Sequence, residues 1–281
     1  MGASEFLVID YKNSSSPKKF VTSLRETGFA SIENLPFSSE QIIKGYELWS
    51  QFFHSDKKFE YRVQPGSQTG FFPFRSENAK GSDLKDLKEF FHVYPKCELP
   101  DFLQEITFEL YENLLQLGRT LLEWIQAETP PEISRSFSEP LPDMLNGSDS
   151  NLLRVLHYPP LEHSETPAGA VRAFAHEDIN LLTLLVAGSA PGLQARDSLG
   201  DWHNVPCDLG MIVVNSGDMM ALLTNNFYKS TTHRVLNPSI SNNVSRFSMP
   251  MFLHPRPTVR LDADYTAGEF LEERLFEIGL K

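Results

Sequence analysis

The sequence predicts a mainly β protein in which helices flank an antiparallel sandwich or barrel. Two observations predict this class. From Leu152 onward, short runs of β-branched and apolar residues alternate with Gly, Pro, Asn and Asp turns, as regular short strands do. Before that point, longer runs carry apolar residues at helical spacing. The 281 residues are enough to bury a substantial core.

The first half of the chain mixes short strands with amphipathic helices. The expected elements are, in order, a strand at 6–10, a helix at 17–27, a strand at 28–34, a helix at 40–56, a strand at 87–94, a helix from about 100 to 128 and a loop or broken helix at 130–150. The helix at 40–56 carries an apolar and aromatic stripe, which we expect to face the core and which consists of Ile42, Ile43, Tyr46, Trp49, Phe52 and Phe53.

The second half reads as a series of strands closed by a helix at 267–278. The strand-like runs are LLRVLHY, INLLTLLVAG, GLQARD, GMIVVNSG, THRVLN and RFSMPMFL. We expect residues 1–150 to form a helical and mixed region that packs on a core of residues 151–281, the two making one integrated domain.

The composition of the chain argues against several classes of function. Acidic residues outnumber basic ones by 37 to 25, a net charge of −12 that opposes binding to nucleic acid or anionic membranes. No apolar stretch is long enough to span a bilayer. The only cysteines, Cys97 and Cys207, form no CxxC pattern, so neither a disulfide scaffold nor a Cys-rich zinc site is expected. We expect a cytoplasmic protein that acts on a small molecule, with no protein partner indicated.

Two histidines and an aspartate form the candidate metal site. His176-Glu177-Asp178 opens a strand-like run, and residues i and i+2 of a strand project from the same face. His176 and Asp178 can therefore point at one centre, and His233 in TTHRVLNP is the best candidate for a third ligand. Two histidines and one carboxylate on one side of a metal form the facial triad of non-haem iron(II) oxygenases.

Arg246 and Ser248 follow on the next expected strand, in RFSMPMFL, and share a face. A guanidinium fork grips a carboxylate through two hydrogen bonds, and the hydroxyl adds another. The pair would suit the distal carboxylate of a 2-oxo diacid whose other end chelates iron.

These motifs resemble, in order, those of the isopenicillin N synthase-like family of iron(II)/2-oxoglutarate-dependent oxygenases. The matching segments are AHEDINLLTLL, PGLQARDSLGDWHNVP, VVNSGDMMALLTNNFYKSTTHRVLNP and RFSMPMFLHP, with LHYPP, SDLKDLKEFFHVY and FLVID…GFASIEN before them. The resemblance covers nearly the whole chain. It implies a distorted double-stranded β-helix, or jelly-roll, core.

The resemblance also implies an enzyme that uses Fe(II), 2-oxoglutarate and dioxygen to oxidise a C–H bond by hydroxylation, desaturation or cyclisation. His176, Asp178 and His233 would be the iron ligands and Arg246 and Ser248 the 2-oxoglutarate anchors. Tyr158 matches a tyrosine that contacts the co-substrate, whereas Leu156 stands where plant relatives carry an asparagine.

Two alternatives stay open at this point. One is an iron(II) oxidase of the same family that does not use 2-oxoglutarate, and the other is a catalytically silent binding protein. The substrate is not identified; an aromatic pocket with one or two cations would suit a small, partly apolar carboxylate. Candidate wall residues, each more often found in core packing, are Phe71, Phe72, Phe74, Arg75, Phe91, His92, Phe174 and Phe252. His92 and Arg172 are the better candidates because polar groups beside apolar runs need partners, and Arg154 would either support the active site or form a structural ion pair.

Overall fold

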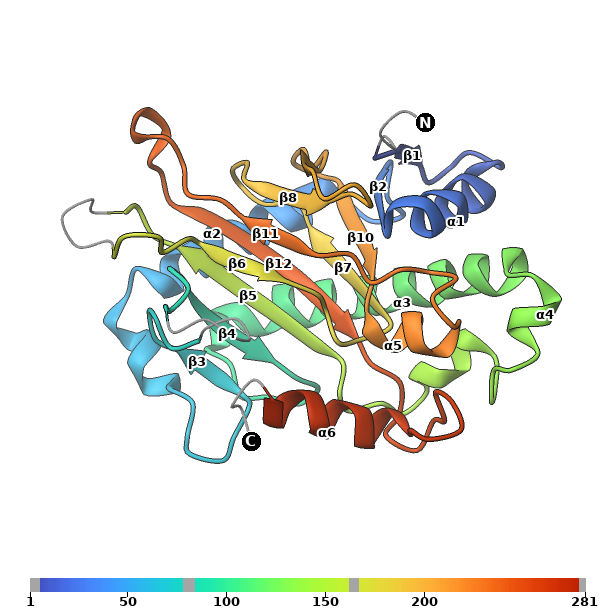
Figure 1. Ribbon diagram of the computed structural model, residues 1–281. Coiled ribbons are helices and arrows are strands. Elements are labelled where there is room, and N and C mark those ends of the chain that lie inside the picture. The colour runs from blue at the N-terminus through green and yellow to red at the C-terminus, as the bar shows by residue number, and fades with distance from the viewer. Residues whose placement is uncertain (1–5, 78–83, 162–166, 278–281) are drawn as a thin grey trace.

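The computed structural model describes residues 6–77, 84–161 and 167–277 (Figure 1). In chain order its elements are β1 (Val8–Asp10), α1 (Ser16–Thr27), β2 (Phe29–Glu33), α2 (Ser39–Phe53), η1 (Asp56–Tyr61), β3 (Gly70–Phe72), β4 (Glu89–Val93), α3 (Asp101–Glu128), α4 (Pro131–Ser134), η2 (Leu141–Leu145), β5 (Leu152–Tyr158), β6 (Ala173–His176), β7 (Leu182–Val186), β8 (Leu193–Arg196), β9 (Trp202–Asn204), β10 (Ile212–Ser216), α5 (Asp218–Leu223), β11 (His233–Val235), η3 (Ile240–Asn242), β12 (Arg246–Leu253) and α6 (Ala267–Glu277).

The strands form two sheets, which confirms the predicted double-stranded β-helix. The large sheet has the order β1-β2-β10-β7-β12-β5-β4-β3, and the small sheet has the order β6-β11-β8-β9. Pairing between the described strands is antiparallel except for β1 with β2. In Figure 1 the small sheet lies in front of the large one, so that residues from both sheets can line the space between them.

Alternation along β12 shows how the sequence divides core from site. The odd-numbered side chains, Phe247 to Leu253, belong to the main hydrophobic core. The even-numbered side chains, Arg246 to Phe252, line a cavity between the two sheets. Because successive side chains of a strand point to opposite faces, one strand supplies both the packing of the fold and the wall of the site.

Helix α3 packs on α1 and α2, all three helices pack against the large sheet, and Figure 1 shows α3 running behind that sheet. The predicted aromatic stripe of α2 is buried, and the indole of Trp49 contacts the rings of Phe52, Phe53 and Phe91. Ile43 was expected in that stripe, but it is 40% exposed. The apolar face is therefore narrower than the sequence pattern indicated.

The strands of the first half join the large sheet. The boundary expected near residue 150 falls just before β5, yet β4 pairs with β5 and β2 pairs with β10. We propose that the two parts fold as one unit, because neither part contains the large sheet by itself.

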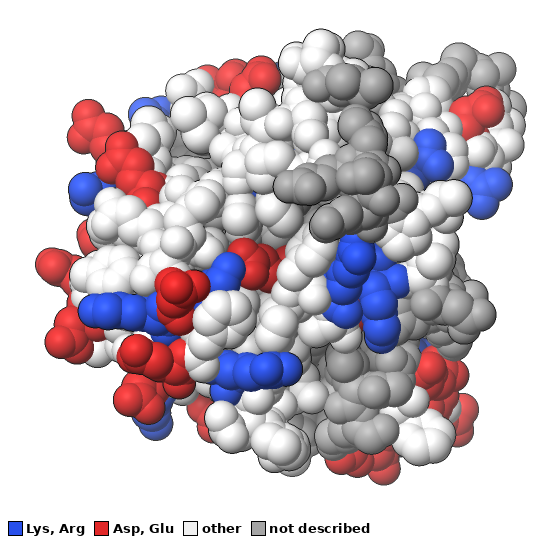
Figure 2. Space-filling model, turned by 90° about the vertical axis from the view of Figure 1, so that its left-hand side faces the viewer, with Lys and Arg blue, Asp and Glu red and all other residues white. Residues whose placement is uncertain are grey.

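The surface carries charges of both signs. Figure 2 shows acidic and basic side chains interspersed on the face turned to the viewer, without a continuous basic band among the residues drawn in colour. Within the described residues, no helix combines the length and the apolar character needed to cross a membrane.

Candidate metal centre

His176, Asp178 and His233 converge between the two sheets. His176 ends β6, His233 begins β11, and these two residues face each other across the β6–β11 pairing. Oδ1 of Asp178 lies 3.9 Å from Nε2 of His176 and 3.8 Å from Nε2 of His233. One donor atom from each residue lies within 4.8 Å of the others, and the described residues contain no second group of this kind.

Asp178 was expected on a strand with His176, and this was wrong. The strand β6 ends at His176, and Asp178 lies in the connection to β7. The connection packs closely on Gly217, where a Cβ atom would lie 2.7 Å from the backbone oxygen of Asp178 and 2.3 Å from that of Asn180. A glycine is needed at residue 217 because any larger residue would push this connection away.

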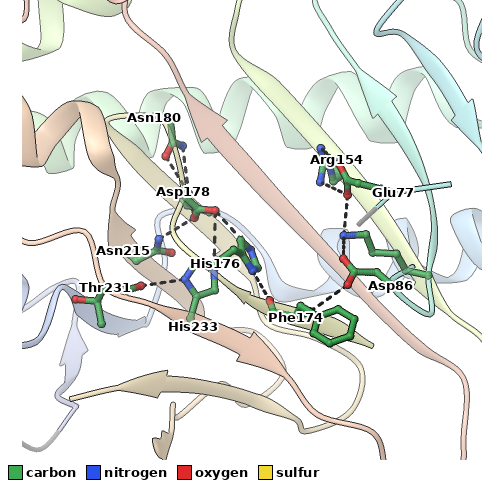
Figure 3. A network of polar contacts seen from close by, with 12 residues as sticks. Glu77, Asp86, Arg154, Phe174, His176, Asp178, Asn180, Asn215, Thr231 and His233 are labelled. Atoms are coloured by element: carbon green, nitrogen blue, oxygen red, sulfur yellow. Dashed lines mark hydrogen bonds and ion pairs between the residues drawn. The ribbon is translucent and has the colours of Figure 1, made fainter. Parts of the chain in front are cut away.

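Hydrogen bonds fix the orientation of both imidazoles (Figure 3). Nδ1 of His176 donates to the backbone oxygen of Phe174 at 2.7 Å, and Nδ1 of His233 donates to that of Thr231 at 3.1 Å. In the neutral form of each ring, a proton on Nδ1 leaves Nε2 free to bind, and both Nε2 atoms face Asp178. This is the arrangement that backbone acceptors impose on metal-binding histidines.

The carboxylate of Asp178 is held from its far side. Thr183 Oγ1 donates to Oδ2 at 2.5 Å and Asn215 Nδ2 donates to the same oxygen at 2.8 Å, which leaves Oδ1 directed at the imidazoles. Burial by itself would raise the pKa of Asp178, but His233, His176 and these two hydrogen bonds lower it below its usual value. Loss of hydration, reinforced by His233, lowers the pKa of His176 to about 4. The site thus presents a carboxylate and a neutral imidazole, the forms that bind metals.

Arg246, Ser248 and Tyr158 line a cavity of about 70 Å³ together with the three converging residues. Arg246 is opposite Tyr158 and Ser248 is opposite Leu156 in the β12–β5 pairing. The guanidinium of Arg246 is 1% exposed; its Nε donates to the backbone oxygen of Ala190, but Nη1 has no partner. A buried donor without a partner indicates a place for a ligand oxygen.

A second buried guanidinium lies beside the first. Arg172 is 1% exposed, its Cζ lies 5.8 Å from the centre of the Tyr158 ring, and that of Arg246 lies 5.1 Å from it. Burial, with the neighbouring Arg246, lowers the pKa of Arg172 to about 10. No carboxylate of the described residues pairs with either side chain. Two buried cations without an anion favour an anionic ligand here.

A larger cavity, of about 680 Å³, borders the centre at His176 and Asp178. Of the wall residues proposed from the sequence, His92, Arg154 and Phe252 line it, whereas Phe71 and Phe91 lie in the core. Sequence reasoning missed Lys88, Asp86 and Glu77, which also line the cavity. The alternation in LKEFFHVY could have indicated Lys88, since it shares a strand face with His92.

His254, just after β12, borders the same cavity and makes stability depend on pH. Burial lowers its pKa from 6.5 to about 4, so between these pH values the unfolded chain binds a proton that the folded protein does not. The contribution of His254 to the free energy of unfolding is fully present above about pH 6.5, and up to about 3 kcal/mol of it is lost as the pH drops to 4. In urea unfolding, the free energy of unfolding should fall less between pH 7.5 and pH 5 for His254→Gln than for the unchanged protein. An equal fall in both proteins would contradict this role.

Comparisons with known proteins match both halves of the chain. The model of the 2OG-Fe(II) oxygenase superfamily matches residues 150–255, and that of the N-terminal region of a non-haem dioxygenase in morphine synthesis matches residues 8–110. A putative oxygenase from Shewanella oneidensis is 43% identical, with a TM-score of 0.89 over 99% of this chain and 100% of that one. A putative 2OG-Fe(II) oxygenase family protein from Caulobacter crescentus is 28% identical, with a TM-score of 0.78 over 98% and 99%. A 2-oxoglutarate-dependent dioxygenase of Monascus ruber is 28% identical over 89% of this chain and 82% of its own length.

Proposed function

This chain belongs to the 2OG-Fe(II) oxygenase superfamily, and we propose that its His176, Asp178 and His233 hold the iron of a dioxygenase that oxidises a C–H bond of a small organic molecule. Members of this class are oxidoreductases that use Fe(II), 2-oxoglutarate and dioxygen. The observation that carries the proposal is the convergence of the three donor atoms beside a buried guanidinium whose Nη1 has no partner.

The donor set fits iron(II). Two imidazole nitrogens and one carboxylate oxygen, all supplied from one side, are the ligands of the non-haem iron facial triad, which leaves positions for other ligands. When bound, iron(II) supplies the redox chemistry by which dioxygen converts 2-oxoglutarate to succinate and carbon dioxide while the substrate is oxidised. The chain contributes orientation of the ligands and a cavity that keeps water from the reacting groups.

The small cavity suits 2-oxoglutarate. Arg246 would grip the distal carboxylate, the hydroxyls of Ser248 and Tyr158 would donate to the bound molecule, and Arg172 would add positive charge from behind the Tyr158 ring. Leu156 offers no hydrogen bond where plant relatives have asparagine, so Arg246 would carry more of the binding. Gly188 is required beside it, because a Cβ there would lie 2.7 Å from Nη2 of Arg246.

The proposed function is tested by measuring whether the protein forms succinate from 2-oxoglutarate. Purified protein supplied with Fe(II) and 2-oxoglutarate should form a weak visible charge-transfer band under nitrogen, and oxygen should then yield succinate. Substrate oxidation without 2-oxoglutarate would identify the oxidase alternative instead. Absence of the band in folded protein would indicate a catalytically silent binding protein.

Asn215 is expected to support the metal site without touching the metal. Asn215→Leu removes the donor to Oδ2 of Asp178, so the carboxylate loses one of its two anchors. Iron affinity should fall by about 10- to 100-fold, a typical effect of such outer partners. Titration with Fe(II) or Mn(II) measures this, and Asn204→Leu, whose side chain bonds Gln194 outside the site, is the control. Equal metal affinities in the two variants would contradict the role.

We also propose that the enzyme works in the cytoplasm and needs no partner protein. Cys97 and Cys207 are both free thiols, as is usual in a reducing compartment. The residues proposed for metal, co-substrate and substrate line two cavities of this chain, which supports a protein that acts alone.

A further inference from the structure

Inside the large cavity, a group of paired charges stands next to the proposed iron site; it comprises Glu77, Asp86, Lys88, His92 and Arg154, and we call it the charged cluster. Nζ of Lys88 lies 2.7 Å from Asp86 Oδ2 and 2.8 Å from Glu77 Oε2. Arg154 reaches both carboxylate oxygens of Glu77, at 3.2 and 3.4 Å. Figure 3 shows Arg154, Glu77 and Asp86 in one chain of contacts beside the three converging residues.

The charged cluster has no net charge. Two cations, Lys88 and Arg154, face two carboxylates, Glu77 and Asp86. His92 is neutral, because burial and then Arg154 hold its pKa well below the usual range. Its Nε2 accepts a hydrogen bond from Nε of Arg154 at 2.8 Å, and its Nδ1 donates to the backbone oxygen of Gln68.

The charged cluster nevertheless has hydrogen-bond donors to spare. An ammonium group has three N–H bonds and a guanidinium has five. Lys88 uses two within the cluster, and Arg154 uses one toward His92 and two toward Glu77. The remaining N–H groups belong to side chains that are only 8% and 17% exposed and that line both cavities. They are preorganised to meet an acceptor oxygen of a bound molecule.

The rest of the cavity wall is acidic. Among the described lining residues, seven carboxylates, Asp178 included, accompany three Lys or Arg side chains. Asp149, Glu177 and Asp218 have no ion-pair partner in the described residues. A carboxylate substrate would meet repulsion from this wall, whereas a neutral oxygen would not.

The charged cluster also connects to the metal centre. Oδ1 of Asp86 accepts a hydrogen bond from the backbone nitrogen of Phe174 at 3.1 Å, and the backbone oxygen of the same residue accepts from Nδ1 of His176. Because Lys88 pairs with Asp86, a group bound at Lys88 would join the same network that orients a proposed iron ligand.

We propose that Lys88 and Arg154 bind the carbonyl oxygen of an uncharged substrate, such as an amide, lactam, imide or ketone, and that the cavity discriminates against carboxylic acids. The proposal rests on the function proposed above. It differs from the carboxylate class that the candidate wall residues suggested, because the buried cations of this wall are already neutralised by Glu77 and Asp86.

Matched amide and acid probes test this substrate class. The full chain, loaded with Fe(II) and 2-oxoglutarate under nitrogen, is titrated with benzamide against benzoate and nicotinamide against nicotinate, following the visible band. Each amide should bind at least about tenfold more tightly than its acid, the size of one well-placed hydrogen bond together with avoided repulsion. Acids that bind as well as the amides, or amides that do not bind at all, would overturn the proposal.

Two variants locate the effect. Lys88→Gln combined with Asp86→Asn removes one cation and one carboxylate together, so the buried charges stay balanced, and Arg154→Lys keeps the charge but loses the fork. Both should bind the amides less tightly and so show a smaller amide preference, whereas Arg274→Gln, at a cation that lines the same cavity from α6, should keep the preference in full. An amide preference that is unchanged in both variants contradicts the proposal. A missing 2-oxoglutarate band in the unchanged protein would instead count against the proposed function.

Discussion

Replacing His233 with alanine is expected to abolish 2-oxoglutarate turnover while leaving the fold intact. The variant removes one of the three donors that converge among the described residues, and His176 and Asp178, two residues apart in the sequence, remain. Two ligands hold a divalent ion far less tightly than three, so succinate formation should fall to the background rate. Succinate yield and Mn(II) titration are the measurements.

A matched histidine outside the site provides the control. His203 on β9 lies 2.8 Å from Asp197, so His203→Ala also breaks a His–Asp pair. This control should retain full turnover, and both variants should show similar thermal unfolding. Turnover by His233→Ala with unchanged metal affinity would remove the basis of the proposed iron site.

The second large effect is expected at Arg246. Arg246→Met should raise the KM for 2-oxoglutarate by about 100-fold, because hydrogen bonds to a charged group contribute roughly 1.5–3 kcal/mol each. The response to 2-oxopentanoate, which has a methyl group in place of the distal carboxylate, should not change. The ratio of the two KM values therefore isolates the contact between the guanidinium and that carboxylate.

The thermal stability of Arg246→Met should not fall, although its affinity for 2-oxoglutarate does. Arg246 and Arg172 are buried near each other without a carboxylate partner, so removing one cation relieves repulsion in the protein without co-substrate. Unfolding of Arg246→Met should occur at an equal or higher temperature than that of the unchanged protein. Arg256→Met, which removes the contact of Nη2 with both carboxylate oxygens of Glu139, should instead lower stability and leave the KM unchanged. Equal effects of the two variants on KM would contradict the assignment.

The outline of the fold could be predicted from periodicity. Runs such as RFSMPMFL and GMIVVNSG give strands β12 and β10 because their side chains alternate between the core and the site. The short strand β3 was not predicted, since it lies in residues 65–82, which are rich in Gly and Ser. Its three residues form a strand through pairing with β4, which is a contact that no local pattern encodes.

The candidate site was predicted in part. The spacing of His176, Asp178 and His233 and the Arg246–Ser248 pair identified the residues that converge. The local reason given for Asp178 was wrong, because the residue lies in a connection held by Gly217 and by hydrogen bonds from Thr183 and Asn215. Tertiary contacts of this kind join residues that are far apart in the sequence.

The sequence by itself determined the class of fold, the identity of the proposed metal ligands and the family, because strand alternation and ordered motifs are local properties of the chain. Only the tertiary structure decided which charges are neutralised and which remain available. Lys88 and Arg154 are neutralised by Glu77 and Asp86, while Arg172 and Arg246 have no such partner. The physical reason is that the state of a buried charge depends on its neighbours in space, and these four cations come from strands, or segments beside strands, that meet only when the sheets assemble.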